Sequence, residues 1–350
     1  MKALMKKRAG PGGFAFEEIG KPEIGDEDLL IEVKAAGICG SDLRLKNIGD
    51  SKALIPPVVI GHEFAGIICE TGKKVSRFRV GERVVSDNSG YLCGTCRYCG
   101  TGNYMMCNHR KGLGFGMDGG FAKYVKINGD LLAINPNTLF RIPGQMTYEE
   151  AVFMDPLANA YKAVIQESNL KAGDSVVVYG MGTIGLLAVR IASLAGARHV
   201  IAVNRSQNER KYEIAQSYGA TEIIYGEKDV PGKIYGITKG EGAEVVIDCA
   251  GANHILEESL QILRKGGEFI KIGYDSEPLN LSLDDFVRKG IKIIGHFAYD
   301  YESWIECMHL LESGMVDVKP LISGRFPLER WEEGFELAES RGGIKVILIP

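Results

Sequence analysis

The 350-residue sequence lacks any long uncharged run. Its longest stretch without a charged residue, 175–189, has 15 residues and contains three glycines, whereas a membrane-spanning helix needs roughly 18 to 20 apolar residues. The amino-terminal MKALMKKRAG carries charge with no apolar core behind it, so it does not read as a secretory signal peptide. These absences predict a cytoplasmic protein with no membrane partner.

The chain also lacks an excess of positive charge. Its 41 Lys and Arg against 45 Asp and Glu give a formal net charge of −4, whereas a protein that tracks nucleic-acid phosphates is normally basic. Apolar residues make up 45% and charged residues 25%, which is typical of a soluble globular protein. We therefore expect no nucleic-acid partner, and the length suggests roughly two domains with large cores.

The predicted secondary structure changes along the chain. Residues 28–150 read as short strands cut by Gly and Asp. Thr147 has Glu150 three residues later, which predicts a capped helix start. From Asp174 onward apolar strands alternate with helical segments, the pattern of parallel βαβ units. The remainder, after Tyr301, predicts two helices and a final strand, so the fold class is α/β.

A glycine motif opens the alternating region. Residues 180–185 read G-M-G-T-I-G between a predicted strand and a predicted helix, which is the context of a dinucleotide-binding turn. Gly180 allows the tight turn, Gly182 lets a pyrophosphate approach the backbone, and Gly185 lets helix and strand pack closely. Thr183 and Ile184 complete the motif at the helix N-terminus, which faces the phosphates. The alternative is a plain glycine-rich turn.

The position that reads the ribose, about 20 residues further on, carries Asn204 rather than the usual acid. An Asp there would repel a 2′-phosphate, and Asn removes that repulsion. Arg205, with Arg210, could pair with the phosphate. These residues predict that NADP is accepted, although Asn can still bond a ribose hydroxyl of NAD.

Eight cysteines are present, and half of them form a tight cluster with C-x2-C-x2-C-x7-C spacing: Cys93, Cys96, Cys99 and Cys107. Four thiolates this close in a glycine-rich loop can close a tetrahedral zinc site with no open position, which is a structural site. An iron–sulfur cluster is the alternative on ligand type. His109, just after the cluster, is read as a loop residue because four ligands already exist.

A second, dispersed set could hold a catalytic metal. Cys39 stands in GICGSD, His62 and Glu63 stand in GHEFAG, and Asp155 opens DPLANA. Three such ligands leave zinc one position for water or substrate. From spacing alone the signal is modest, since a lone Cys or His is more often a core residue.

The motifs C-G-S-D, G-H-E, the cysteine cluster, a carboxylate before Pro-Leu and G-x-G-x-x-G together resemble the medium-chain zinc-dependent alcohol dehydrogenases, over nearly the whole chain. Within that family the chain is most similar to sorbitol (polyol) dehydrogenases. The resemblance implies a GroES-like catalytic domain from residues 1–152 and 298–350, and an inserted Rossmann domain over 153–297. It also implies a homodimer or homotetramer with two zinc ions per chain and NAD(P).

The resemblance implies a role for each matching residue. Cys39 and His62 resemble catalytic zinc ligands, with Glu63 as the adjacent acidic ligand and Asp155 bound directly or through water. Ser41 resembles the hydroxyl that takes the alcohol proton, and Asp42 the partner that orients the zinc-bound His. The residues that match the family's substrate pocket are Phe115 and Tyr299.

Three departures from the family pattern stand out. Asp155 replaces the usual Glu and is one methylene shorter. Arg44 stands where many members have the His that ends a proton relay, so the proton would leave through water. Ala298 stands where sorbitol dehydrogenases tend to have Arg, which argues against sorbitol itself as the substrate.

Glu63 and Asp155 compete for one ligand place on the catalytic zinc. We predict that Asp155 is the third ligand in the resting enzyme and that Glu63 replaces it when substrate binds.

These parts predict a hydride transfer between a secondary hydroxyl of a polyol, cyclitol or sugar acid and NAD(P). Two alternatives within the enzyme class are a threonine-3-dehydrogenase-like activity and a simple secondary alcohol dehydrogenase. A non-catalytic nucleotide-binding regulator of the same fold is the alternative from another class, and the intact candidate ligands argue against it.

Overall fold

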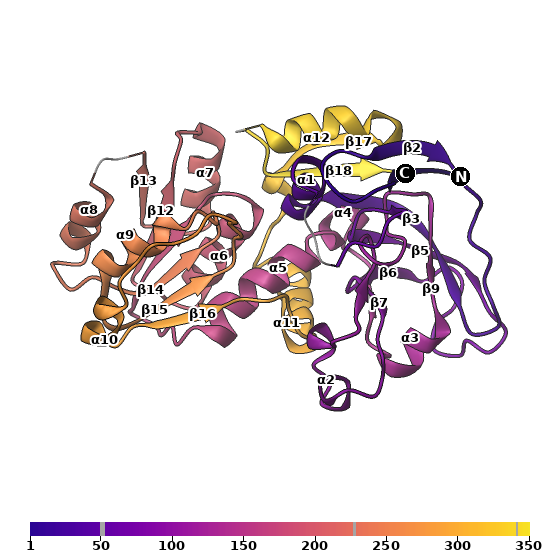
Figure 1. The fold of residues 1–350 in the computed structure, drawn as a ribbon, viewed down its shortest axis with the longest axis horizontal. Helices are drawn as coiled ribbons and strands as arrows, with labels where there is room; N and C mark the ends of the chain where they lie inside the picture. Colours follow the sequence, from indigo (N-terminus) through magenta and orange to yellow (C-terminus); the bar gives the residue numbers. More distant parts are fainter. Residues whose placement is uncertain (50–52, 227–228, 341) are drawn as a thin grey trace. The chain divides into compact units, whose positions relative to one another are not determined.

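The computed structural model describes residues 1–49, 53–226, 229–340 and 342–350 (Figure 1). It divides into two compact units: a terminal unit of Met1–Asp155 with Asp300–Pro350, and a central unit of Pro156–Tyr299. The family resemblance predicts boundaries after residues 152 and 297. Within the described ranges, no helix has the length and apolarity to cross a membrane.

The terminal unit is built on a seven-stranded sheet in the order β10-β6-β5-β3-β18-β17, with β9 also paired to β3. Its strands are β3 (Leu29–Ile38), β5 (Glu63–Thr71), β6 (Arg83–Ser86), β9 (Tyr124–Ile127), β10 (Leu139–Arg141), β17 (Ile322–Pro327) and β18 (Lys345–Ile349). Smaller sheets join β1 (Lys2–Lys6), β2 (Phe14–Glu18) and β4 (Val58–Val59), and β7 (Ser89–Tyr91) and β8 (Lys111–Gly112).

The helices of the terminal unit are short in its first part and longer near the C-terminus. They are α1 (Gly40–Asn47), α2 (Arg97–Gly100), α3 (Gly129–Ile134), α4 (Tyr148–Ala151), the start of α5 (Met154–Tyr161), α11 (Tyr301–Glu312) and α12 (Trp331–Glu339), with 3-10 turns η1 (Tyr104–Met106), η3 (Lys319–Leu321) and η4 (Leu328–Arg330). The predicted cap is confirmed, because Thr147 Oγ1 accepts from the Glu150 amide at 3.2 Å.

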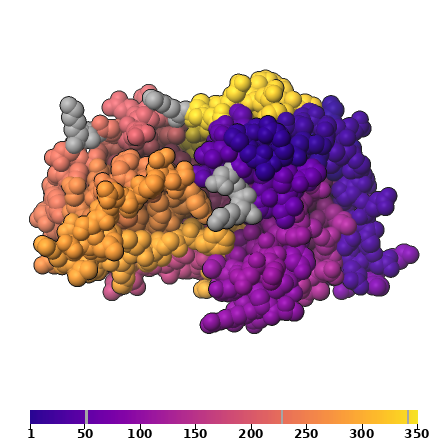
Figure 2. Space-filling view, in the orientation of Figure 1, coloured from indigo at the N-terminus to yellow at the C-terminus, as the bar shows by residue number. Residues whose placement is uncertain are grey.

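Strand pairing in the large sheet brings together three distant parts of the chain. β5 runs antiparallel to β3 and sets Glu63 opposite Gly37. β18 runs antiparallel to the same strand and sets Val346 opposite Ile38. A Cβ at Gly37 would lie 2.5 Å from a Glu63 carboxylate oxygen, so any larger residue would displace that carboxylate. Figure 2 shows the C-terminal segment in yellow beside the N-terminal segment in indigo.

The central unit is a parallel sheet in the order β13-β12-β11-β14-β15-β16, the arrangement of a doubly wound dinucleotide-binding fold. Its strands are β11 (Ser175–Tyr179), β12 (His199–Asn204), β13 (Glu222–Tyr225), β14 (Ala243–Asp248), β15 (Leu263–Lys271) and β16 (Lys292–Gly295). Its helices are the rest of α5, the π-helix η2 (Lys162–Glu167), α6 (Thr183–Leu194), α7 (Glu209–Ser217), α8 (Val230–Ile237), α9 (His254–Ile262) and α10 (Asp284–Lys289).

The predicted alternation of strands and helices is confirmed, with differences at element ends. The apolar spacing of residues 254–267, HILEESLQILRKGG, predicts one helix that ends at the glycine pair. In the structure α9 ends at Ile262, and residues 263–267 already belong to β15. The register of β15 against β14 is irregular there, and Ala243 pairs with Leu263. Pairing to a neighbouring strand therefore outweighs the helical spacing of this segment.

Candidate active site and metal centres

A sulfur, a ring nitrogen and a carboxylate oxygen meet in the terminal unit. Cys39, His62 and Glu63 offer ligand atoms that all lie within 4.8 Å of one another. Cys39 directly follows β3, and His62 directly precedes β5, so the β3–β5 pairing brings them together. His62 and Glu63 are buried, with 5% and 2% of their surfaces exposed. The structure thus assembles three of the four predicted ligands.

These three residues fit a zinc ion. Zinc bonds of about 2.0–2.3 Å in a tetrahedron place ligand atoms roughly 3.3–3.8 Å apart, so a set within 4.8 Å needs only small side-chain rotations to close. Nδ1 of His62 is buried and forms no hydrogen bond to any residue described. It faces Asp42 Oδ1 at 3.7 Å, which leaves Nε2 as the nitrogen for a metal.

Helix α1 carries the two residues that surround this histidine. Asp42 is fully buried and accepts the Cys39 amide through Oδ2 at 2.9 Å. The Ser41 hydroxyl lies 3.4 Å from Nε2 of His62. Burial lowers the pKa of His62, but the charges of Asp42 and Cys39 outweigh it and hold that pKa well above the usual value. Asp42 therefore holds the turn at Cys39 and lies beside the His62 ring, 3.7 Å from Nδ1.

Lys345, which the sequence analysis missed, is buried against the ligand cluster. Its ammonium forms an ion pair with Glu63 Oε2 and donates to the Ile38 carbonyl at 3.3 Å. Burial by itself lowers the pKa of Lys345, and the charges of Glu63 and Cys39 reverse this and raise it. A single lysine inside the otherwise apolar strand IKVILIP was the available signal, because a buried charge needs a partner.

Asp155 lies near this cluster but outside the 4.8 Å group. It is 8% exposed, and its charge acts on Lys345. Its Oδ2 accepts a hydrogen bond from Asn88 Nδ2 at 3.0 Å. The carboxylate oxygen that accompanies the sulfur and the ring nitrogen belongs to Glu63, and which carboxylate binds zinc stays a prediction.

The two expected substrate residues fall in different units. Phe115 packs its ring against His62, with ring centroids 5.1 Å apart, and so lies at the candidate ligand cluster. Tyr299 is the last residue of the central unit and is 3% exposed. Ala298, just before it, has a φ of 51°, which is uncommon for a residue other than glycine.

The clustered cysteines form a second metal group. All four sulfurs lie within 4.8 Å of one another, and the four residues are Cys93, Cys96, Cys99 and Cys107. No disulfide joins them. Backbone N–H groups of Thr95 and Cys96 lower the pKa of Cys93 to about 6, which favours the thiolate that binds metal. This set fits a closed tetrahedral zinc, and exposed His109 is outside it.

The glycine motif forms the turn between β11 and α6. Gly180 has a φ of 89°, and a Cβ there would lie 2.9 Å from the Ala250 amide nitrogen. A Cβ on Gly185 would lie 1.8 Å from the Gly180 carbonyl, so these two positions require glycine. Gly182 is the N-cap of α6 and has open space at its Cβ position. Thr183 and Ile184 begin α6, whose N-terminus is thus open to an anion.

Asn204 is the last residue of β12, and its side chain forms two hydrogen bonds to nearby backbone groups. Its Oδ1 accepts the Met181 amide at 3.2 Å, and its Nδ2 donates to the Ser206 carbonyl at 2.8 Å. Asn204 thereby links the ribose position to the glycine turn. Arg205 and Arg210 are exposed beyond it.

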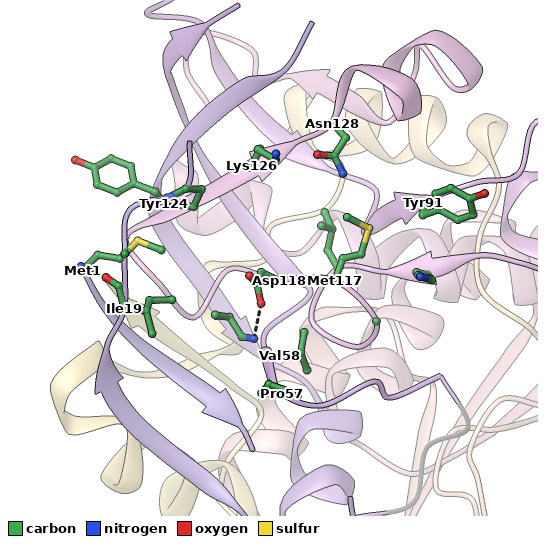
Figure 3. Close-up of a pocket in the computed structure, with 16 residues that line it drawn as sticks. Met1, Ile19, Pro57, Val58, Tyr91, Met117, Asp118, Tyr124, Lys126 and Asn128 are labelled. Carbon is green, nitrogen blue, oxygen red and sulfur yellow. Dashed lines mark hydrogen bonds between the residues drawn. The ribbon is translucent and has the colours of Figure 1, made fainter. Parts of the chain in front are cut away.

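A separate groove of about 570 Å³ opens on the terminal unit, and Figure 3 shows the residues that line it. Lys126 and Asp118 face it, and Asp118 accepts the Val59 amide at 2.8 Å. Lys126 pairs with Asp28 at 3.4 Å. None of the candidate ligands lines this groove, so it is not the site of the predicted chemistry.

Two family models match the chain. The alcohol dehydrogenase GroES-like domain matches residues 25–137, and the zinc-binding dehydrogenase model matches residues 183–313. The chain therefore belongs to the medium-chain zinc-dependent alcohol dehydrogenase family and is a zinc-dependent oxidoreductase that uses NAD(P). The predicted family, GroES-like fold and Rossmann fold are confirmed.

Relatives with different substrates match along the whole chain. The L-threonine 3-dehydrogenase of Bacillus velezensis is 36% identical over 355 residues, covering 100% of this chain and 99% of the relative. The sorbitol dehydrogenase of Halalkalibacterium halodurans is 34% identical over 352 residues, with the same coverage. A structure from Sinorhizobium meliloti, described as a zinc-binding dehydrogenase bound to NADP, has a TM-score of 0.89 and 31% identity, covering 100% of this chain and 99% of that chain.

Proposed function

We propose that the protein reversibly oxidises a secondary hydroxyl of a polyol, cyclitol or sugar acid with NAD(P). The cluster of Cys39, His62 and Glu63, with Asp155 and Lys345 beside it, supports this proposal. Two carboxylates and an ammonium make the surroundings polar, which suits a substrate that carries more than one hydroxyl. A relative named sorbitol dehydrogenase supports the same substrate class.

In this proposal Cys39 and His62 hold the catalytic zinc together with one carboxylate. A bound zinc would act as a Lewis acid on the substrate hydroxyl, and a bound NAD(P) would supply the hydride acceptor. Ser41, which already contacts the His62 ring at 3.4 Å, takes the hydroxyl proton. Asp42 holds the ring in orientation through Nδ1. Phe115 lines the substrate side of this cluster.

We expect Asp155→Ala to lose more exchangeable zinc than Glu63→Ala. Glu63 already has Lys345 as a partner, and drawing Glu63 fully to a metal would leave that ammonium buried and unpaired, at a large cost. Metal content of the two purified variants checks this. Full zinc in Asp155→Ala with loss only in Glu63→Ala would reverse the assignment.

The ribose position supports acceptance of NADP. We expect Asn204→Asp to shift preference toward NAD, because a carboxylate would face the 2′-phosphate and a like-charge contact could cost on the order of a few kcal/mol. Asp keeps the acceptor for the Met181 amide, so the turn should survive. The ratio of kcat/KM for the two nucleotides is the measurement. A wild type that uses only NAD, with the variant unchanged, would contradict this assignment.

We also propose a cytoplasmic homo-oligomer, a dimer or a tetramer. At the end of the central sheet, β16 pairs with β15 alone among the strands described. Apolar side chains are exposed there: Val287 is 82% exposed, Leu283 67% and Ile293 48%. Such a patch favours burial against a partner. The molar mass of the protein in solution, against 38.2 kDa for one chain, tests this.

A substrate panel tests the proposed reaction. It contains polyols, cyclitols, sugar acids, phosphorylated polyols, L-threonine and simple secondary alcohols, each with NAD and with NADP. We expect the highest kcat/KM on a compound with neighbouring hydroxyls. L-threonine is the second candidate, because threonine dehydrogenases match the whole chain, and highest activity on it would replace the polyol proposal.

A further inference from the structure

Asn88 has an unusual backbone at a buried position in the terminal unit. Its φ is 56°, in the left-handed region, and it is 8% exposed. Asn tolerates this region better than most residues, yet the conformation is seldom used without a reason. Its side-chain amide donates to Asp155 Oδ2 at 3.0 Å. Asn88, with its left-handed backbone, therefore hydrogen-bonds to Asp155, a candidate metal ligand.

The side chain of Arg110 forms hydrogen bonds with Asn88. Its guanidinium donates to Asn88 Oδ1 and to the Asn88 backbone carbonyl, the latter at 3.4 Å. With Oδ1 bonded to a cation, the amide of Asn88 is oriented with Nδ2 toward Asp155. Burial raises the pKa of neighbouring Asp87, and the charge of Arg110 opposes that rise, so the cation serves two polar groups.

A backbone hydrogen bond links Arg110 to the loop that carries the cysteine cluster. The backbone amide of Arg110 donates to the Cys107 carbonyl at 3.1 Å, three residues back. Cys107 is a member of the four-sulfur group and is 6% exposed. A continuous path therefore runs from the cysteine cluster through Arg110 and Asn88 to Asp155.

We propose that Arg110 and Asn88 are positioning residues that keep the Asp155 carboxylate directed at the catalytic metal, and that they couple this carboxylate to the cysteine cluster. The proposal rests on the proposed metal role of Asp155. Removing either residue weakens or removes the Asn88 hydrogen bond that orients the Asp155 carboxylate, and the Cys39–His62 site then holds its metal less well. Groups that orient a metal ligand typically contribute about 10–100-fold in metal affinity.

The test measures metal release rather than turnover. The holoenzyme and its variants are mixed with a colorimetric chelator, and release of the exchangeable zinc is timed. A parallel sample carries Co²⁺ in that site, and its visible ligand-field spectrum is recorded. We expect Asn88→Gly and Arg110→Gln to release exchangeable metal about 10–100-fold faster and to change the cobalt spectrum, with the cysteine-bound metal retained. Arg110→Lys keeps the positive charge, so its metal-release rate should lie between those of the wild type and Arg110→Gln.

A double variant separates positioning from general damage. In an Asp155→Asn background, Asn88→Gly should add no further change in release rate, because its effect acts through that carboxylate.

Glycine can keep the left-handed backbone conformation that Asn88 has. The matched backbone control is therefore Lys239→Gly, because Lys239 is exposed and has a φ of 55°. Arg97→Gln, an exposed arginine within the cysteine loop, is the matched charge control.

Three results would overturn the proposal: wild-type release rate and spectrum in Asn88→Gly, an equal effect of that change in the Asp155→Asn background, or joint loss of both metals. A wild-type chain without exchangeable metal would overturn the proposed function as well. Normal metal behaviour with no turnover on any substrate would contradict the proposed function alone.

Discussion

Cys39→Ser should yield a folded protein that has lost turnover. Lewis-acid catalysis contributes several kcal/mol and each 1.4 kcal/mol is about tenfold, so we expect kcat/KM to fall on the order of 1000-fold or more. Cys39 is the N-cap of α1, where Ser is among the favoured residues, so the helix should form as before. The measurements are activity, circular dichroism and zinc content.

A matched cysteine provides the control for this variant. Cys69 lies outside both metal groups, and its sulfur donates only a weak bond to the Leu30 carbonyl at 3.5 Å. Cys69→Ser should therefore keep both zinc ions and normal activity. Cys39→Ser should keep the cysteine-bound zinc and lose the other one. Normal turnover in Cys39→Ser would show that the catalytic ligands have been assigned to the wrong residues.

Lys345→Met should destabilise the protein strongly. The side chains of Lys345 and Glu63 are 2% and 1% exposed, and breaking a buried pair by removing one partner typically costs about 3–5 kcal/mol. The remaining carboxylate of Glu63 would be buried without its cation. The free energy of unfolding from urea titration is the measurement, made after chelation of the exchangeable metal, so that no zinc beside Glu63 replaces the lost ammonium.

A double variant identifies the cause of this loss. Glu63→Gln with Lys345→Met removes both charges, and we expect it to recover a large part of the stability that Lys345→Met loses. Lys74→Met breaks an exposed pair with Glu27, whose side chains are 63% and 58% exposed, and should change stability by less than about 1 kcal/mol. An equally small change in Lys345→Met would mean that the buried pair does not hold Glu63.

Motifs with a fixed local spacing were predictable from the sequence. The glycine turn spans six residues and the cysteine cluster 15, so local geometry decides them. Cys39 and His62 were found because the family motifs around them are distinctive, and β3–β5 pairing then brings them together. The capped helix start at Thr147 likewise depends on residues three positions apart.

Residues whose roles depend on distant contacts were missed. Lys345 reaches Glu63 only because β18 adds to β3 from the far end of the chain. Asn88 and Arg110 act through side-chain hydrogen bonds across 67 and 22 residues. No periodicity or spacing marks such contacts. A lone lysine in an apolar strand was a signal for the first, and the asparagine at a left-handed φ became visible only in the fold.

The most direct test of the account is nucleotide reduction by the same protein sample before and after removal of its exchangeable zinc. The chelated sample, still holding the cysteine-bound zinc, is assayed on the substrate panel by the absorbance of reduced nicotinamide. The account predicts turnover of a compound with neighbouring hydroxyls, its loss on chelation and its return when zinc is restored. Undiminished turnover after the Cys39–His62 zinc is removed would contradict it.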